Sequence, residues 1–319
     1  MNEEKFRRMS ITHMLDKSVY LHKRNLGTSA LYLFVMSILI TVIGVILLFI
    51  VLLPTALFMS TTSMMLGNNI FETGYLVSIS MLLLIIVSLF YSINSIEQSG
   101  IIIIGSNGFL GRKVDVSDAI TGAFKNILKV LSVMLAGMLL LIPVFLFCGV
   151  ILFQVLSNLT PGTFGFYAGI IVTSIIFIVV LSYFMVVHAF SLQIAIIEKI
   201  YFFKALKKSR ILVKGRFWRT FGCFISASLS VSLINLSIIS VFALIGGIIF
   251  AILGSSGIND DTLVLLTMLG NIARTPLQVL VSLFVSPISG IFMTILYYNM
   301  RFEKEGYDIE LNILRLKNS

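Results

Sequence analysis

Charged residues are scarce in this chain. Aspartate, glutamate, lysine and arginine make up 12% of its 319 residues, whereas soluble domains carry about 25%. Because apolar residues make up 58% of the chain, the few charges cannot cover a water-facing surface. A soluble globular protein is therefore excluded, and hydrocarbon is the expected solvent around most of the chain.

Cysteine and histidine are also scarce. The two cysteines, Cys148 and Cys223, lie in or beside apolar runs, where a thiol behaves as a small hydrophobic side chain. They predict neither a disulfide framework nor a metal site. The three histidines lack the His-Glu-x-x-His spacing, and the glycines fit neither a P-loop nor a dinucleotide fingerprint. The sequence therefore predicts no metal and no cofactor.

Acidic residues are outnumbered by basic ones, 14 to 23, which gives a net charge of +9. On a soluble domain, such an excess would indicate a nucleic-acid partner. Here every lysine and arginine except Arg274 falls in one of four short stretches that alternate with long apolar runs. Membrane topology explains this distribution, so no nucleic-acid partner is predicted.

Six apolar runs contain no Lys, Arg, Asp or Glu and are long enough to cross a membrane. A spanning helix needs about 20 residues, and a lipid-exposed backbone must satisfy its own hydrogen bonds. A β-barrel is excluded because the runs are continuous rather than alternating. Pro287 lies in the last run and is expected to kink it. The predicted spans are about 30–53, 75–96, 130–156, 166–195, 221–253 and 277–300.

The positive-inside rule orients these spans. The basic stretches are the N-terminal segment, the second and fourth connections and the C-terminal tail, so both termini are predicted to be cytoplasmic. Trp218, the only tryptophan, falls at the predicted cytoplasmic mouth of the fifth span, where an interfacial anchor belongs. The first apolar run lacks a cleavage pattern and is expected to be a retained anchor. Residues 1–319 are predicted to form one polytopic membrane domain.

An amphipathic stretch precedes each pair of spans. Leu15, Ile120 and Leu206 mark their apolar faces, which lie opposite charged residues at helical spacing. Ser10 is the expected N-cap of the first helix. Cationic amphipathic helices of this kind are typical of the membrane interface. The predicted fold is an all-α integral membrane protein with six transmembrane helices as three hairpins, each preceded by a cytoplasmic interfacial helix. Duplication and the usual composition of cytoplasmic connections explain this threefold pattern equally well.

Three passages resemble a known family. They are RMSITHMLDKSVYLHKRNL at residues 8–26, ALKKSR at 205–210 with Gly215 and Trp218, and LYYNMR with EGYDIE at 296–310. They are similar to the opening, the centre and the closing signature of the bacterial glycerophosphoryl diester phosphodiesterase membrane-domain family. The chain departs from the family at Asn299, where an aspartate is expected.

The resemblance implies a multi-helix domain of the bacterial plasma membrane. Family members are sometimes joined to a phosphodiesterase domain and are often found alone without an assigned activity. That catalytic domain would need a soluble barrel of about 250 residues, whereas only about 19 residues follow the last predicted span. The resemblance therefore implies the stand-alone kind, without phosphodiesterase activity.

The spans offer little chemistry. His188, in the fourth span, is their only histidine, and an intramembrane ionisable residue is a candidate functional site. A neutral histidine bonded to a neighbouring helix is the commoner case and is the expectation here. Serines of the fifth span, such as Ser226 and Ser230, are expected to be packing contacts rather than the lining of a polar route.

Two functions remain open. The first is a non-catalytic scaffold or accessory subunit that binds a membrane or cytoplasmic protein partner, or lipid headgroups, through its basic face. The second is a transporter or efflux component for an apolar or lipid-like substrate, and a membrane enzyme has the least support. The candidate contact residues in the fourth connection are Lys204, Lys207, Lys208, Arg210, Lys214, Arg216 and Trp218.

Overall fold

The fold was analysed in a computed structural model. The structure describes residues 7–66, 94–158, 160, 162–255 and 260–318, and every regular element in these residues is a helix. Five of the described helical stretches are long and apolar enough to cross a membrane. Most of the remaining predicted span, 75–96, lies outside the described residues. The prediction of an all-helical membrane protein is therefore confirmed.

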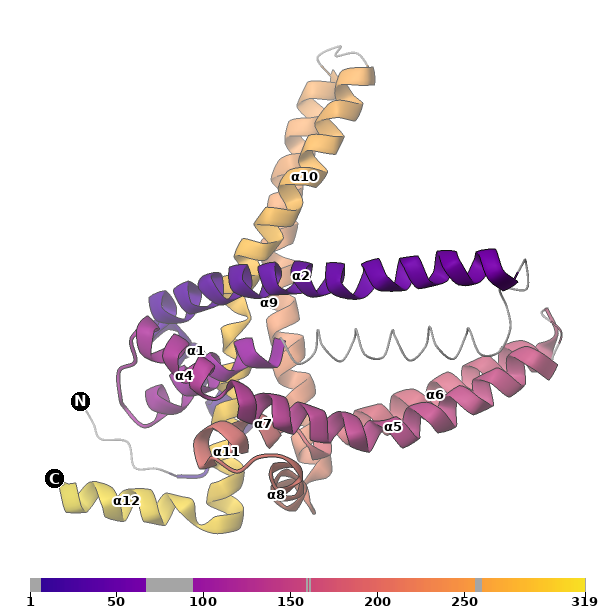
Figure 1. The fold of residues 1–319 in the computed structure, drawn as a ribbon. Helices are drawn as coiled ribbons and strands as arrows, with labels where there is room; N and C mark the ends of the chain where they lie inside the picture. Colours follow the sequence, from indigo (N-terminus) through magenta and orange to yellow (C-terminus); the bar gives the residue numbers. More distant parts are fainter. Residues whose placement is uncertain (1–6, 67–93, 159, 161, 256–259, 319) are drawn as a thin grey trace. The chain divides into compact units, whose positions relative to one another are not determined.

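Helices α2, α5 and α9 extend beyond both ends of the predicted spans, whereas α6 ends at Val187, before the predicted end of the fourth span at residue 195. A helix rises about 1.5 Å per residue, so the 41 residues of α2 form a helix longer than the hydrocarbon thickness of about 30 Å. Antiparallel hairpins are formed by α5 with α6 and by α9 with α10 (Figure 1). These helices are α2 (Leu26–Leu66), α5 (Ile127–Asn158), α6 (Phe164–Val187), α9 (Phe217–Ser255) and α10 (Asp260–Val285).

The sixth predicted span is divided at its proline. Helix α10 ends at Val285, and α11 (Pro287–Glu305) begins with Pro287 at its first position. Proline has no N–H to continue the helix and fits the first turn of the next one. The expected kink is thus a break between two helices. Residues 260–274 are helical and continuous with the first part of this span.

The three predicted amphipathic segments are all short helices. They are α1 (Ile11–Arg24), α4 (Val116–Lys125) and α8 (Phe203–Val213). The Ser10 hydroxyl caps α1 by accepting a hydrogen bond from the His13 N–H, as predicted.

The chain divides into two compact units. Unit 1 contains α1, α9, α10, α11 and the final helix α12 (Tyr307–Asn318). Unit 2 contains α5, α6, α8 and most of α2 and α4, together with α7 (Ser191–Gln193) and the π-helical turn η1 (Ile194–Glu198). The bounds are Met1–Leu33, Ile104–Val116 and Gly215–Ser319 for unit 1, and Phe34–Ile103 and Ser117–Lys214 for unit 2.

Two joints between a short helix and the following long helix are built in the same way. Asn25 separates α1 from α2, and its side-chain amide donates to the Leu21 carbonyl at 2.9 Å. Asn126 separates α4 from α5, and its amide donates to the Gly122 carbonyl at 2.9 Å. In both cases the backbone N–H of the same asparagine also donates to that carbonyl, at 3.1 Å and 3.2 Å, so the side-chain amide adds a second bond at the joint. The third joint differs, because Gly215 with φ +80° turns the chain before α9.

Burial relates the three short helices more closely than their sequences do. A small, fully buried residue lies seven positions before Asn25, before Asn126 and before the third joint at Arg216. Small residues let the helix backbone approach its neighbour closely. This register aligns Leu15 and Leu206 with Val116 rather than with Ile120. The small residues are Ser18, Ala119 and Ser209.

Each short helix packs on the end of a long one within its own unit. Helix α8 packs on α5, α6 and α7. Helix α4 lies close to the described helical segment 94–109, because a Cβ added at Gly122 would lie 2.7 Å from Ile103 Cδ1. Helix α1 packs on α11, at the opposite end of the sequence. The first short helix is thus held by the last long one.

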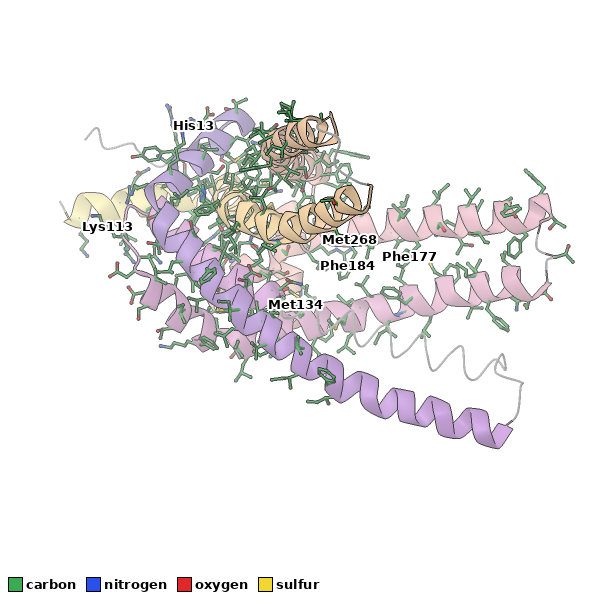
Figure 2. All side chains as sticks on the ribbon, turned by 90° about the horizontal axis from the view of Figure 1, so that it is seen from above. His13, Lys113, Met134, Phe177, Phe184 and Met268 are labelled. Carbon is green, nitrogen blue, oxygen red and sulfur yellow. The ribbon has the colours of Figure 1, made fainter. Side chains whose placement is uncertain are left out.

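Small residues also set the spacing of the α5–α6 hairpin. A Cβ added at Gly137 would touch the Phe184 ring at 3.8 Å, and Gly169 faces Val155. Phe145 packs at a tilt against Phe177, with ring centroids 5.2 Å apart. Many other side chains of this hairpin point outward (Figure 2), as expected of helices in contact with lipid.

Gly215 provides a test of the third joint. We expect Gly215→Ala to destabilise the protein by about 1 kcal/mol, because an L side chain is strained at positive φ. Gly222→Ala is the matched control, since Gly222 is helical and its Cβ would meet open space. Thermal unfolding in a single detergent should show a lower midpoint for Gly215→Ala only. A drop of the same size in both variants would contradict the assignment.

Candidate functional site

The rotation of α8 is fixed by one serine. The Ser209 hydroxyl donates to the Val187 carbonyl at 2.8 Å and accepts from the Phe190 N–H at 3.2 Å. Ser209 and Phe190 are fully buried. Both backbone groups lie at the turn that ends α6, where helix termini leave donors and acceptors unsatisfied. Removing the hydroxyl would leave them unpaired, which costs about 1–3 kcal/mol each.

The side of α8 opposite Ser209 forms an exposed surface. We call it the α8 face and define it by three basic residues and four apolar ones. Ile211, Tyr201, Phe202 and Phe203 are exposed by 56%, 53%, 38% and 42%. No acidic side chain belongs to this face. The members of the α8 face are Tyr201, Phe202, Phe203, Lys204, Lys207, Arg210 and Ile211.

The loop before α8 holds an unusual backbone. Lys199 ends the π-helical turn with φ +58°, and Phe202 has φ +59° and ψ −146°. A bulky residue in this region costs about 1–3 kcal/mol and persists only where the surroundings impose it. The Phe202 ring packs edge-on against Phe203, with centroids 4.5 Å apart. The loop thus keeps a strained backbone although its aromatic side chains remain exposed.

One predicted contact residue of α8 serves the fold instead. The Lys208 ammonium forms an ion pair with Glu198, the last residue of η1. Both side chains are mostly buried, at 25% and 12% exposure. This pair ties the start of the strained loop to the middle of α8. Lys208 therefore does not belong to the exposed set with Lys204, Lys207 and Arg210.

The other candidates of the fourth connection divide in the same way. Lys214 is exposed at the C-cap of α8. Arg216 and Trp218 belong to unit 1. Arg216 forms an ion pair with Glu303, whereas Trp218 is 78% exposed at the start of α9 and packs edge-on against Phe217.

His188 makes its hydrogen bond within its own helix. It is the C-cap of α6, and its Nδ1 lies 3.0 Å from the Phe184 carbonyl. Its ring also packs on the Phe184 ring, with centroids 4.3 Å apart. The prediction that His188 bonds to a neighbouring helix was therefore wrong. His188 lies where α6 ends, and the last carbonyls of that helix need partners. The serines of α9 behave alike, since Ser226 and Ser230 each donate to a carbonyl of the preceding turn.

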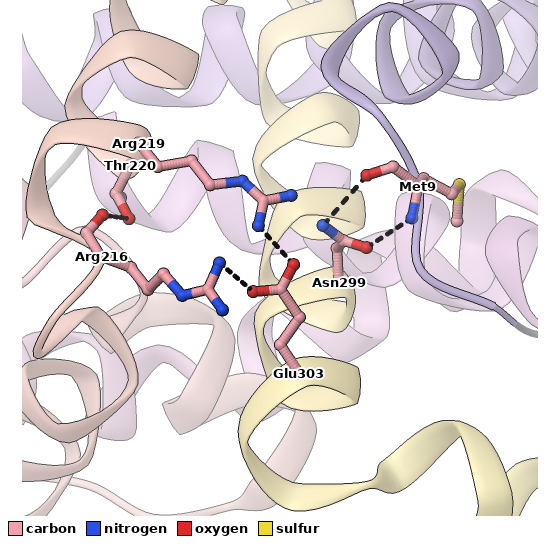
Figure 3. Close-up of polar contacts among 6 residues, drawn as sticks. All are labelled: Met9, Arg216, Arg219, Thr220, Asn299 and Glu303. Atoms are coloured by element: carbon pink, nitrogen blue, oxygen red, sulfur yellow. Dashed lines mark hydrogen bonds and ion pairs between the residues drawn. The ribbon is translucent and has the colours of Figure 1, made fainter.

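In unit 1, α11 holds the N-terminal segment through Asn299. This fully buried amide accepts from the Met9 N–H at 2.8 Å and donates to the Met9 carbonyl at 3.4 Å (Figure 3). An ionised aspartate only accepts hydrogen bonds, so the amide matches both backbone groups where a carboxylate would leave the carbonyl without a donor. An asparagine rather than an aspartate at position 299 therefore has a structural use.

Glu303 joins α11 to the start of α9. Its side chain is 4% exposed and lies between two arginines. Arg219 donates a hydrogen bond to one carboxylate oxygen, and Arg216 Nη1 lies 3.0 Å from Glu303 Oε2 (Figure 3). A carboxylate this buried requires compensation of its charge, which the two cations provide. The sequence alone did not predict this cluster, because Glu303 lies 84 positions from Arg219 in the chain.

An aromatic column continues from α11 into α12. Tyr298 stacks on Phe109 with centroids 4.9 Å apart and on Tyr307 at 6.2 Å. The Tyr298 hydroxyl shares a 2.7 Å hydrogen bond with Ser106. The Arg301 guanidinium lies 3.7 Å from the Tyr307 centroid and pairs with Glu305. Arg301 and Glu305 are four positions apart in the same helix. The helix, however, breaks at Gly306, with φ +64°, before α12.

Helix α1 buries a histidine. His22 is 4% exposed, and its Nδ1 has no hydrogen-bond partner. Burial lowers the pKa of His22 below its usual value, and a hydrogen bond to the backbone of Phe284 opposes this shift. Met14, Ser18 and Leu21 are buried on the same side of α1. This apolar side is covered by protein, chiefly α11, and not by lipid as predicted.

Comparison with protein-family models, curated proteins and solved structures finds no match for this chain. Among the described residues, no group of three His, Cys, Asp or Glu side chains lies close enough together to hold a metal ion. The residues of the α8 face themselves make it the candidate site.

The docking of α1 should depend on pH through His22. Since burial lowers the folded pKa of His22, only the undocked helix takes up a proton as the pH falls through the usual value of about 6.5. Stability is thus present above this value and is lost below it. We expect hydrogen-exchange protection of α1 to fall between pH 7.5 and 5.5, by at most about tenfold per pH unit. His22→Gln should remove this dependence and His13→Gln should keep it, so an unchanged slope in His22→Gln would refute the assignment.

Glu303 should matter more than its exposed neighbour. We expect Glu303→Gln to destabilise the protein by about 1–2 kcal/mol, because two arginines lose their counter-charge while remaining partly hydrated. Glu305→Gln removes an exposed pair on the same helix and should cost less than about 0.5 kcal/mol. Thermal unfolding of both variants in one detergent measures the difference. Equal midpoints would rule out a structural role for Glu303.

Proposed function

We propose that this protein is a non-catalytic scaffold or accessory subunit of the bacterial plasma membrane. It acts through a basic cytoplasmic face that binds a membrane or cytoplasmic protein partner, or lipid headgroups. The α8 face is the contact surface, and its seven exposed basic and apolar members carry the proposal. The resemblance to a membrane-domain family that often lacks an assigned activity supports the same role.

The proposal includes a topology. Six spans cross the membrane as three hairpins, with 75–96 as the second span and both termini in the cytoplasm. The distribution of lysine and arginine supports this orientation. The basic residues divide into those that form ion pairs and those that are exposed, and this division supports the contact role. Lys208 and Arg219 are partly buried and pair with Glu198 and Glu303, whereas Lys204, Lys207 and Arg210 are exposed.

The alternative is a transporter for an apolar or lipid-like substrate. An ion-coupled carrier usually buries acids or bases along its path, and the predicted spans contain no Asp, Glu, Lys or Arg. The hydroxyls of Ser226 and Ser230 donate within α9. The scaffold role is therefore the better supported function. Purified protein that alone moves a fluorescent phospholipid across liposomes would overturn it.

The scaffold role is tested by charge reversal on the α8 face. We expect the wild-type protein, purified from native membranes in mild detergent, to retain a component in fixed stoichiometry. The variant with Lys204→Glu, Lys207→Glu and Arg210→Glu should lose it, because three attractive charges become repulsive. The matched control reverses Arg112, Lys113 and Lys125, which are also exposed, and should retain it. Equal retention by both variants would contradict the proposal.

A further inference from the structure

The α8 face combines exposed apolar side chains with exposed cations. Three aromatic rings and an isoleucine are exposed by 38–56% beside three cations. Exposed apolar surface costs about 25 cal/mol per Å² relative to a covered state. A layer with hydrocarbon below and phosphate above accommodates both kinds, since rings and lysine stems enter the acyl boundary while the charges remain at the headgroups.

The chain keeps the α8 face near that layer. The candidate span Phe164–Glu198 ends four residues before α8. Four extended residues reach at most about 14 Å, so α8 cannot move far from the end of the span. The ion pair of Lys208 with Glu198 shortens this tether further. The face is thus held at the depth where the headgroups of the surrounding leaflet lie.

The backbone directs the rings outward. The positive φ of Phe202 carries a conformational cost, and the two hydrogen bonds of Ser209 prevent α8 from rolling to bury this side. A protein that only needed to connect two spans would gain by relaxing both features. The strained loop and the fixed rotation therefore favour a ligand that covers the rings of Tyr201, Phe202 and Phe203.

We infer that the α8 face binds anionic phospholipid of its own leaflet, with Lys204, Lys207 and Arg210 on the headgroup phosphates and the rings among the upper acyl carbons. This inference rests on the proposed function and names the ligand of the same face. An acidic protein would satisfy the cations but not the rings. Free phosphate would likewise leave the rings in water.

The test uses the full chain in detergent and two short-chain lipids that differ only in headgroup. Dioctanoyl phosphatidylglycerol should bind more tightly than dioctanoyl phosphatidylcholine. Replacing Lys204, Lys207 and Arg210 by Gln should weaken phosphatidylglycerol binding about 100-fold, because each cation near a charged surface contributes about fivefold. Gln at Arg112, Lys113 and Lys125 is the matched control and should change affinity less than twofold. Lys207→Gln alone should lose about fivefold if the triple variant does not fold.

The rings distinguish lipid from other anions. Tyr201→Ser with Phe203→Ser should weaken phosphatidylglycerol binding at least fivefold, and glycerol phosphate without acyl chains should not compete. Equal affinity for the two lipids, equal effects of the α8 and control variants, or full competition by glycerol phosphate would each overturn the inference. A retained acidic protein that is lost on α8 charge reversal, without lipid preference, would leave the proposed function standing. If phosphatidylglycerol binds the α8 face but the co-purifying component is retained after charge reversal there, only the scaffold role is overturned.

Discussion

The docking of short amphipathic helices on the ends of long ones is the constraint on which this architecture depends. A helix in hydrocarbon satisfies its own backbone, but its last carbonyls and first N–H groups need partners where it ends. Asn25 and Asn126 add a side-chain bond to a carbonyl that also accepts from the backbone. Ser209 serves this need across two helices. The same contacts fix which side of each short helix is covered, and so which side is presented outward.

The ion pairs and long-range hydrogen bonds described above gather near helix ends, whereas hydroxyls such as that of Ser226 bond within their own long helix. Glu303 and its two arginines, Asn299 and the tyrosine column all lie on α11 or beside it in unit 1. In contrast, α9 exposes large apolar side chains along its length, such as Leu236 and Leu244 at 64%. This division is physically reasonable, because unpaired polar groups are costly in lipid and ion pairs are best formed where water can still hydrate part of each charge.

Periodicity and charge predicted the elements well because they are local properties. The short helices, the Ser10 cap and the break at Pro287 each follow from residues within one or two turns. The partners of these elements could not be predicted, since an apolar face does not say which helix covers it. The apolar side of α1 was expected to rest on lipid and instead packs on α11. Lys208 and Arg216 were likewise indistinguishable from their exposed neighbours until their acidic partners were located.

The bond between Met9 and Asn299 also sets an order of events during synthesis. The two residues are 290 positions apart, and a ribosome adds about 5–20 residues per second, so α1 waits roughly 15–60 s for α11. Throughout that interval the part of its apolar side that packs on α11 is uncovered, although Gly108, which lies close to Leu21, is made earlier. The nascent chain must shelter this helix on the bilayer or on a chaperone until the last span has been inserted.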